Sequence, residues 1–161
     1  MDEVVKVGMA DWKASGHPGV LTTLGLGSCV GICLYDPKRK IIGMAHIMLP
    51  SSDAVRANAN RAKFADTCIP DLIDGMAKLG ADSRALVAKI AGGAQMFAYT
   101  ASNDIIRVGA RNAEATRALL EKFRIPILAD DTGGNHGRTI EFHSADGRLM
   151  VKTIGHGVQW L

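Results

Sequence analysis

One cysteine and one histidine flank a short turn at a spacing that suits thiol chemistry. The turn is Asp36-Pro37-Lys38-Arg39, with proline at the second position of a type I turn. Cys29 lies nine residues before Lys38, and His46 lies eight residues after it. Residues equidistant from the turn of an antiparallel hairpin face each other. We therefore expect Cys29 and His46 to be cross-strand neighbours, directly opposite or one position apart.

A histidine beside a cysteine is the minimum that catalysis by a thiolate requires. A free thiol has a pKa of about 8.5, and a neighbouring imidazolium favours its ionised form. The same ring can protonate a leaving group and then activate water. Thr23 is the candidate to orient the imidazole, because its segment returns to Cys29 after a short loop. Gly27 and Ser28 allow a tight turn whose backbone N–H groups can support an oxyanion.

Other roles for these residues remain open from spacing alone. Free cysteine is among the most buried residue types, and a histidine in an apolar strand is often a satisfied core residue. Cys33 and Cys68 fit the core, since Cys68 shares the apolar face of a predicted helix. A metal site formed by Cys29, Cys33 and His46 lacks a fourth ligand and a paired CxxC motif. The segment 24–29 matches only G-x-G before a strand, so it is not a dinucleotide-binding fingerprint.

The elements that must position these residues alternate between strands and helices. We expect strands over residues 3–9, 20–24, 29–35, 41–48, 85–91, 125–129, 139–143 and 148–154. A helical repeat of apolar residues runs from Phe64 to Leu79, with Pro70 predicting a kink or a later start and Gly80 a C-cap. Asn112 is a candidate N-cap of a second helix that ends at Phe123, and residues 97–111 and 130–135 are expected to be loops.

This order of elements predicts an α/β (α+β) fold, a layered sandwich of mixed sheets flanked by two main helices. The strands are apolar on both faces, which predicts sheets that are buried on both sides. The length of 161 residues, with 47% hydrophobic and 22% charged residues, suits a single folded domain spanning residues 1–161.

The amino-acid composition also limits the kinds of binding partner that we expect. The net charge is only +3, and the short basic clusters carry no interleaved aromatic residues, so nucleic-acid binding is not expected. No apolar run approaches the roughly 18 residues that a membrane-spanning helix needs. Three cysteines without a recognisable signal peptide predict a cytoplasmic protein whose thiols stay reduced.

Five segments, in this order, resemble motifs of the CheD family of chemoreceptor glutamine deamidases. They are Thr23-Leu24-Gly25-Leu26-Gly27-Ser28-Cys29, Met44-Ala45-His46-Ile47-Met48-Leu49-Pro50, Lys89-Ile90-Ala91-Gly92-Gly93-Ala94-Gln95-Met96-Phe97, Gly109-Ala110-Arg111-Asn112 and Asp131-Thr132-Gly133-Gly134-Asn135. The resemblance spans nearly the whole chain. It implies an α/β sandwich similar to the catalytic domain of deamidating bacterial toxins.

The resemblance further implies a cysteine hydrolase that converts selected glutamine side chains of bacterial chemoreceptors to glutamate without a cofactor. On this reading Cys29 is the nucleophile, His46 the general acid and base, and Thr23 the residue that orients the histidine. The family also binds, in some bacteria, a CheC-type phosphatase. Its N-terminal segment often reads Gly-x-Gly-Glu-Tyr, whereas residues 7–12 here read Val-Gly-Met-Ala-Asp-Trp.

Two alternatives compete with this interpretation. One is a chemotaxis interaction protein that binds receptors or a CheC-type phosphatase without catalysis. The other is a different cysteine hydrolase, such as a peptidase or a small-molecule amidase.

Overall fold

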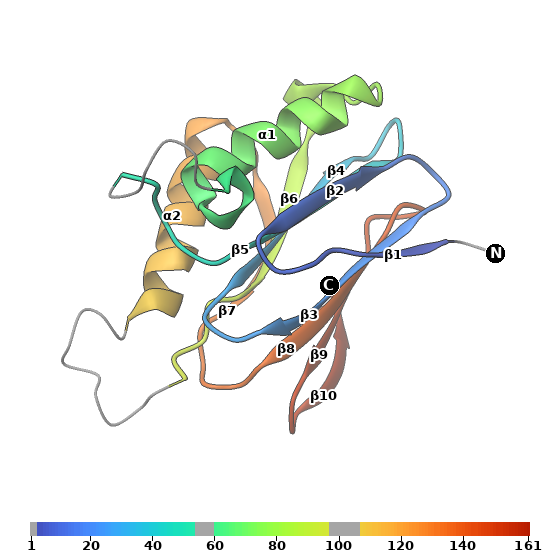
Figure 1. Ribbon diagram of the computed structural model, residues 1–161. Coiled ribbons are helices and arrows are strands. Elements are labelled where there is room, and N and C mark those ends of the chain that lie inside the picture. The colour runs from blue at the N-terminus through green and yellow to red at the C-terminus, as the bar shows by residue number, and fades with distance from the viewer. Residues whose placement is uncertain (1–2, 54–59, 97–106) are drawn as a thin grey trace.

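Two five-stranded sheets pack face to face, and two helices cover the outer face of one of them (Figure 1). The computed structural model describes residues 3–53, 60–96 and 107–161. In the first sheet the strand order is β1-β3-β8-β9-β10, and in the second it is β2-β5-β4-β6-β7. Both sheets mix parallel and antiparallel pairs. The predicted layered α+β sandwich with two main helices is therefore confirmed.

The ten strands of the described residues are short. They are β1 Val4–Lys6, β2 Asp11–Ser15, β3 Val20–Leu26, β4 Val30–Asp36, β5 Ile41–Ile47, β6 Val87–Gly92, β7 Ile127–Thr132, β8 Arg138–His143, β9 Leu149–Thr153 and β10 Gly157–Trp160. The helices are α1 Ala65–Lys78 and α2 Val108–Lys122, with single 3₁₀ turns at Arg61–Lys63 and Ser83–Ala85.

The second sheet is buried on both faces because helices cover one face and the first sheet covers the other. Every residue of β4 and β5 is buried. Side chains on one face of β4, such as Ile32 and Leu34, pack against the helices, while Cys33 and Tyr35 pack between the sheets. The first sheet differs from the second. Along β8, buried residues alternate with partly exposed residues, so the outer face of this sheet is not buried. The expectation of burial on both sides is thus wrong for this sheet.

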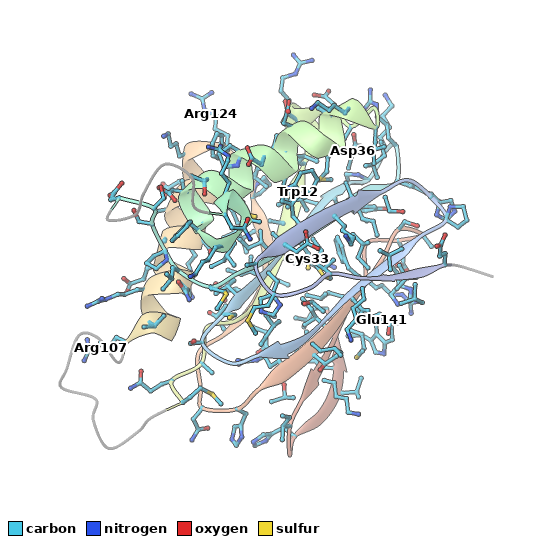
Figure 2. The ribbon with its side chains drawn as sticks, viewed as in Figure 1. Trp12, Cys33, Asp36, Arg107, Arg124 and Glu141 are labelled. Atoms are coloured by element: carbon cyan, nitrogen blue, oxygen red, sulfur yellow. The ribbon has the colours of Figure 1, made fainter. Side chains whose placement is uncertain are left out.

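Helix α1 includes Pro70 rather than beginning after it. The helix ends at Lys78, with Leu79 as its C-cap and Gly80 at a φ of +107°. Such a φ is one that glycine adopts without steric cost, which explains the stop. The ring of Trp12 on β2 packs directly against Gly75 of α1, so any side chain at residue 75 would overlap it. Figure 2 shows Trp12 between its strand and this helix.

Helix α2 begins at Val108, four residues before the predicted N-cap. Asn112 therefore lies inside the helix and is fully buried, and residues 108–111 are helical rather than loop. An asparagine is present here for a reason other than capping. Its side chain donates to the backbone carbonyl oxygens of Ser28 and Met48. Most of the expected loop, residues 97–106, lies outside the described residues.

Three further differences concern strands with weak hydrophobic patterns. The predicted strand over 3–9 ends at Lys6, and β2 follows it as a separate strand that pairs with β5. Strand β10 was not predicted, because it has only four residues, all of them exposed at a sheet edge. Strand β7 extends to Thr132, beyond the predicted end at residue 129, since its parallel pairing with β6 holds its acidic residues in the sheet.

Candidate active site

Cys29 lies in a bend between β3 and β4, and its backbone is held from outside the bend. The amide of Gly93 donates to the carbonyl oxygen of Cys29 at 2.8 Å, and the amide of Ala94 donates to that of Gly27 at 2.8 Å. Gly92 has a φ of +109°, and a Cβ atom there would overlap the carbonyl oxygen of Cys29. The glycines at 92 and 93 therefore allow the end of β6 to approach the cysteine closely.

The hairpin register places His46 opposite Gly31, not opposite Cys29. Val30 pairs with Ile47, so the register extended by one residue puts Cys29 two positions along from His46. We predicted that the two residues would be directly opposite or one position apart, and this prediction is wrong by one position. The connecting turn spans residues 37–40, with Lys40 at a φ of +55°, and this turn sets the register. An offset of two keeps both residues on one face of the sheet, as diagonal neighbours.

That shared face is the one between the two sheets. Alternate residues Cys33 and Tyr35 of β4, and Ile42 and Met44 of β5, belong to the core between the sheets together with Cys29. His46 continues the same alternation two residues beyond Met44. The cysteine and the histidine are both buried, with 8% and 1% of their surface exposed. The thiol and the imidazole are not hydrogen-bonded to each other in this structure.

Thr23 reaches His46 from the opposite sheet. Its hydroxyl oxygen lies 2.7 Å from Nδ1 of His46 and 2.8 Å from the carbonyl oxygen of Val7. A carbonyl oxygen can only accept, so the hydroxyl donates its one hydrogen to Val7 and accepts a hydrogen from Nδ1. This assignment leaves Nε2 of His46 with a lone pair. Nε2 is buried and has no hydrogen-bond partner among the described residues.

Burial sets the protonation state of the pair. Desolvation lowers the pKa of His46 below its ordinary value, so the ring is neutral near pH 7. Desolvation also raises the pKa of the Cys29 thiol, an effect partly offset by its own backbone N–H, which lowers that pKa. The resting pair is therefore a thiol and a neutral imidazole. An imidazole with a free lone pair in this environment can act as a general base toward a thiol.

Gly27 and Ser28 lead into the cysteine as expected for a tight turn. Their bend, together with Cys29, is the only part of residues 20–36 that is not strand. Among the described residues, the amides of Ser28 and Cys29 donate to no other residue. The N–H of Cys29 interacts with the thiol of the same residue. Backbone donors of this kind are the usual components of an oxyanion hole.

The other two cysteines are buried in the core, as predicted. Cys33 has no exposed surface and lies between the sheets (Figure 2), where burial raises its pKa well above the ordinary range. Cys68 faces the sheet from α1, and burial raises its pKa to about 12. Within residues 3–53, 60–96 and 107–161, no three His, Cys, Asp or Glu side chains gather in a way that could hold a metal ion.

Two further residues, Val7 and Arg138, hold this region. Val7 contributes only its carbonyl oxygen to Thr23, and a backbone acceptor leaves no signal in side-chain identity. Arg138 is 7% exposed and donates to the carbonyl oxygens of Gly92 at 3.2 Å and Gly133 at 2.9 Å. The Arg138 side chain therefore holds the two loop segments at Gly92 and Gly133, and it does not extend toward solvent.

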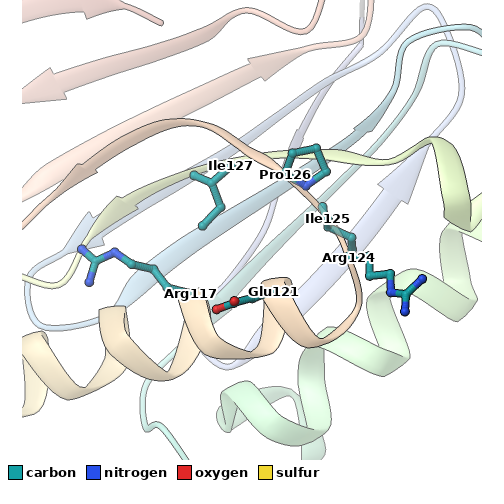
Figure 3. Close-up of a pocket in the computed structure, with 6 residues that line it drawn as sticks. All are labelled: Arg117, Glu121, Arg124, Ile125, Pro126 and Ile127. Carbon is teal, nitrogen blue, oxygen red and sulfur yellow. The ribbon is translucent and has the colours of Figure 1, made fainter.

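A hollow elsewhere on the protein contains none of these residues. Its volume is about 450 Å³, and it lies between α2 and the segment entering β7, as Figure 3 shows. Its lining includes Arg117, whose guanidinium is already bound to Asp130 at 2.7 Å and to Thr132. A smaller hollow of about 210 Å³, bordered by Gly93 and Gly133, lies beside the loops that hold Cys29.

Comparison with known proteins identifies the family. Residues 48–153 match the family model described as "CheD chemotactic sensory transduction". A relative from Caldanaerobacter subterraneus subsp. tengcongensis, named probable chemoreceptor glutamine deamidase CheD, is 57% identical over 99% of this chain and 98% of its own length. A relative of the same name from Lachnoclostridium phytofermentans is 57% identical over 96% of each chain. The chemoreceptor glutamine deamidase CheD of Halalkalibacterium halodurans is 49% identical over 98% of each.

This sandwich of two mixed sheets, which Thr23 and His46 join by a hydrogen bond, is thus the fold of a CheD-type protein. The chain belongs to the CheD family. The resemblance inferred from the five sequence motifs is confirmed. No helix among the described residues has the length and apolar character needed to cross a membrane.

Proposed function

We propose that the protein is an amide hydrolase that converts glutamine side chains of bacterial chemoreceptors to glutamate, with Cys29 as its nucleophile. The observation that carries the proposal is the buried chain of contacts from Val7 through Thr23 to His46. This chain fixes one imidazole tautomer and leaves Nε2 able to accept a proton on the face that Cys29 shares. The names of relatives 49–57% identical to this chain support the substrate class.

In the first half of the proposed reaction, Nε2 of His46 takes the proton of the Cys29 thiol. The thiolate attacks the carboxamide carbon of the substrate glutamine and forms a tetrahedral oxyanion. The amides of Ser28 and Cys29 donate to that oxyanion. The carbon–nitrogen bond then breaks, the protonated His46 gives its proton to the departing nitrogen, and ammonia leaves a thioester on Cys29.

In the second half, His46 removes a proton from water, and the resulting hydroxide attacks the thioester carbon. The carbon–sulfur bond breaks, the thiolate recovers its proton from His46, and glutamate is released. The net change is the hydrolysis of one carboxamide by one water molecule to a carboxylic acid and ammonia, which ionise near pH 7 to carboxylate and ammonium. Thr23 keeps the ring in the required tautomer through both halves, since it accepts from Nδ1 throughout.

The thiol chemistry requires a reducing environment. The three cysteines are free in this structure, and a cytoplasmic location would keep Cys29 reduced. We propose that location for the reaction, at the cytoplasmic part of the receptors. Binding of a CheC-type phosphatase stays a prediction.

The proposal is tested by incubating the protein with the cytoplasmic fragment of a chemoreceptor. Ammonia release is measured together with the intact mass of the fragment. We expect a mass gain of about one dalton per modified glutamine and release of equimolar ammonia. Shortening of the fragment would identify a peptidase instead. Tight binding without any mass change would identify a non-catalytic interaction protein.

A further inference from the structure

The carboxamide of Asn112 connects the segment before Cys29 to the segment after His46. Its Nδ2 donates to the carbonyl oxygen of Ser28 at 2.9 Å and to that of Met48 at 2.9 Å. Both partners are backbone carbonyls that can only accept, so they fix the amide with its NH₂ group toward them. Asn112 has no exposed surface. One buried side chain of α2 thus holds two strands of the second sheet at the ends where the candidate residues lie.

The bond to Ser28 has a geometric consequence for Cys29. The carbonyl of Ser28 and the N–H of Cys29 belong to the same planar trans peptide group, in which the two bonds point in opposite directions. A donor that holds the Ser28 oxygen therefore also fixes the direction of the Cys29 N–H. That N–H interacts with the Cys29 thiol and lowers the pKa of the thiol. It is also one of the two amides available to an oxyanion.

The helix that carries Asn112 is itself fixed against the same region. Gly109 of α2 packs backbone against backbone on Ala94, so a Cβ atom at residue 109 would overlap the Ala94 carbonyl oxygen. Ala94 in turn donates its amide to Gly27. The start of α2 therefore fixes two consecutive carbonyl groups in the bend before Cys29. Asn112 binds that of Ser28 directly, and Ala94, against which Gly109 packs, binds that of Gly27.

The two hydrogen bonds of the carboxamide use only its NH₂ group. Its Oδ1 is buried and has no hydrogen-bond partner among the described residues. Burying an unpaired acceptor is unfavourable, and this cost is offset by the two carbonyl oxygens that the NH₂ group satisfies. The carboxamide is therefore held at residue 112 by its bonds to Ser28 and Met48.

We propose that Asn112 is a positioning residue of the deamidation reaction, which acts by fixing the Ser28–Cys29 peptide plane and the spacing between Cys29 and His46. The inference rests on the proposed function, because it assigns Asn112 a part in that reaction. Asn112 touches neither the thiol nor the imidazole. Its effect is transmitted through Ser28 on one side and through Met48, two residues after His46, on the other.

The test compares Asn112→Ala with Thr116→Val. Thr116 lies one turn further along α2 and is equally buried, but its hydroxyl donates only to the carbonyl oxygen of Asn112 within the helix. Each variant is assayed for kcat and KM on a receptor fragment. The pKa of the Cys29 thiol is measured separately from the pH dependence of alkylation by iodoacetamide. Both assays are run well below the thermal midpoint of each variant.

We expect Asn112→Ala to lower kcat about 10- to 100-fold with KM nearly unchanged, because the reacting groups are misplaced while the receptor still binds. We also expect the thiol pKa to rise in Asn112→Ala and not in Thr116→Val. If Asn112→Ala does not fold, Asn112→Ser takes its place, since serine can donate back within the helix but is too short to reach Ser28.

Equal kcat and equal thiol pKa in the two variants, with only stability reduced, would overturn the inference. This outcome differs from failure of the proposed function, in which the wild-type protein itself would not deamidate the fragment. The alkylation measurement needs no receptor substrate. It therefore tests the effect of Asn112 on Cys29 even in that case.

Discussion

The hydroxyl oxygen of Thr23 lies 2.7 Å from Nδ1 of His46, and this contact joins the two sheets of the sandwich. Thr23 belongs to β3 of the first sheet and His46 to β5 of the second. Neither residue has more than 1% of its surface exposed. The packing of the sheets therefore determines the tautomer of the histidine. Any change that shifts one sheet relative to the other will also alter the candidate base.

Replacing Thr23 with valine tests this contact directly. Valine has the same shape but cannot accept from Nδ1, so the imidazole loses the partner that fixes its tautomer. We expect kcat to fall about 10- to 100-fold, with a smaller change in KM. Thr23→Ser keeps the hydroxyl and should retain most of the activity.

The neighbouring Thr22 supplies the matched control for this substitution. Its hydroxyl donates to the carbonyl oxygen of Ile140 and does not contact His46. Thr22→Val should therefore show nearly wild-type kinetics. Equal losses in Thr22→Val and Thr23→Val would contradict a specific role for the Thr23 hydroxyl.

The pH dependence of kcat/KM should reflect the burial of the pair. Burial lowers the pKa of His46, so the acid limb is expected below the ordinary histidine value of about 6.5. Burial raises the pKa of the Cys29 thiol, so the alkaline limb is expected above about 8.5. The measurement is the rate on a receptor fragment from pH 5 to 10. An acid limb above pH 7 would contradict a neutral imidazole as the base.

The same shift predicts how stability depends on pH. Because the folded-state pKa of His46 is below the unfolded value of about 6.5, the unfolded chain binds more protons between the two values. The free energy of unfolding should therefore decrease as the pH falls from about 6.5 toward the folded-state pKa. Urea unfolding of wild type and His46→Gln isolates this contribution, since the variant lacks the titrating group. Identical pH profiles for the two proteins would contradict it.

Substitution of Gly92 tests the close approach of β6 to the cysteine. Gly92→Ala introduces a Cβ atom that overlaps the carbonyl oxygen of Cys29, at a φ of +109°. Gly155→Ala introduces comparable backbone strain at a φ of +79°, with no atom within 4 Å. Each strained residue is expected to cost about 1–3 kcal/mol of stability. Only Gly92→Ala should also lower kcat, and an equal kcat in the two variants would show that Cys29 tolerates displacement.

Much of the fold follows from the sequence because buried strands carry continuous apolar segments. The hairpin of β4 and β5 was recognisable from two apolar segments around a proline turn, and it places Cys29 and His46 on one face. The exact register was not, since it depends on the conformation of Lys40 in a four-residue turn. Strand β10 was missed because an exposed edge strand needs no hydrophobic pattern.

The site was predictable where side-chain type carries the chemistry and unpredictable where the backbone does. Cys29, His46 and Thr23 were predicted from their types and spacing together with the family resemblance, and the structure joins Thr23 to His46 by a hydrogen bond. The acceptor from Val7 is a main-chain oxygen that any residue provides. Asn112 was interpreted as a helix cap because its partners, Ser28 and Met48, are 84 and 64 residues away in the chain.

Cys29 is the proposed nucleophile of the deamidation reaction. The most direct measurement is the mass gain of a receptor fragment with wild type, Cys29→Ala and Cys33→Ala side by side. Cys33 is the matched control, because it is a fully buried thiol in the core between the sheets. We expect a gain of about one dalton per modified glutamine with wild type and Cys33→Ala, and no gain with Cys29→Ala. Deamidation by Cys29→Ala at the wild-type rate would contradict this proposal.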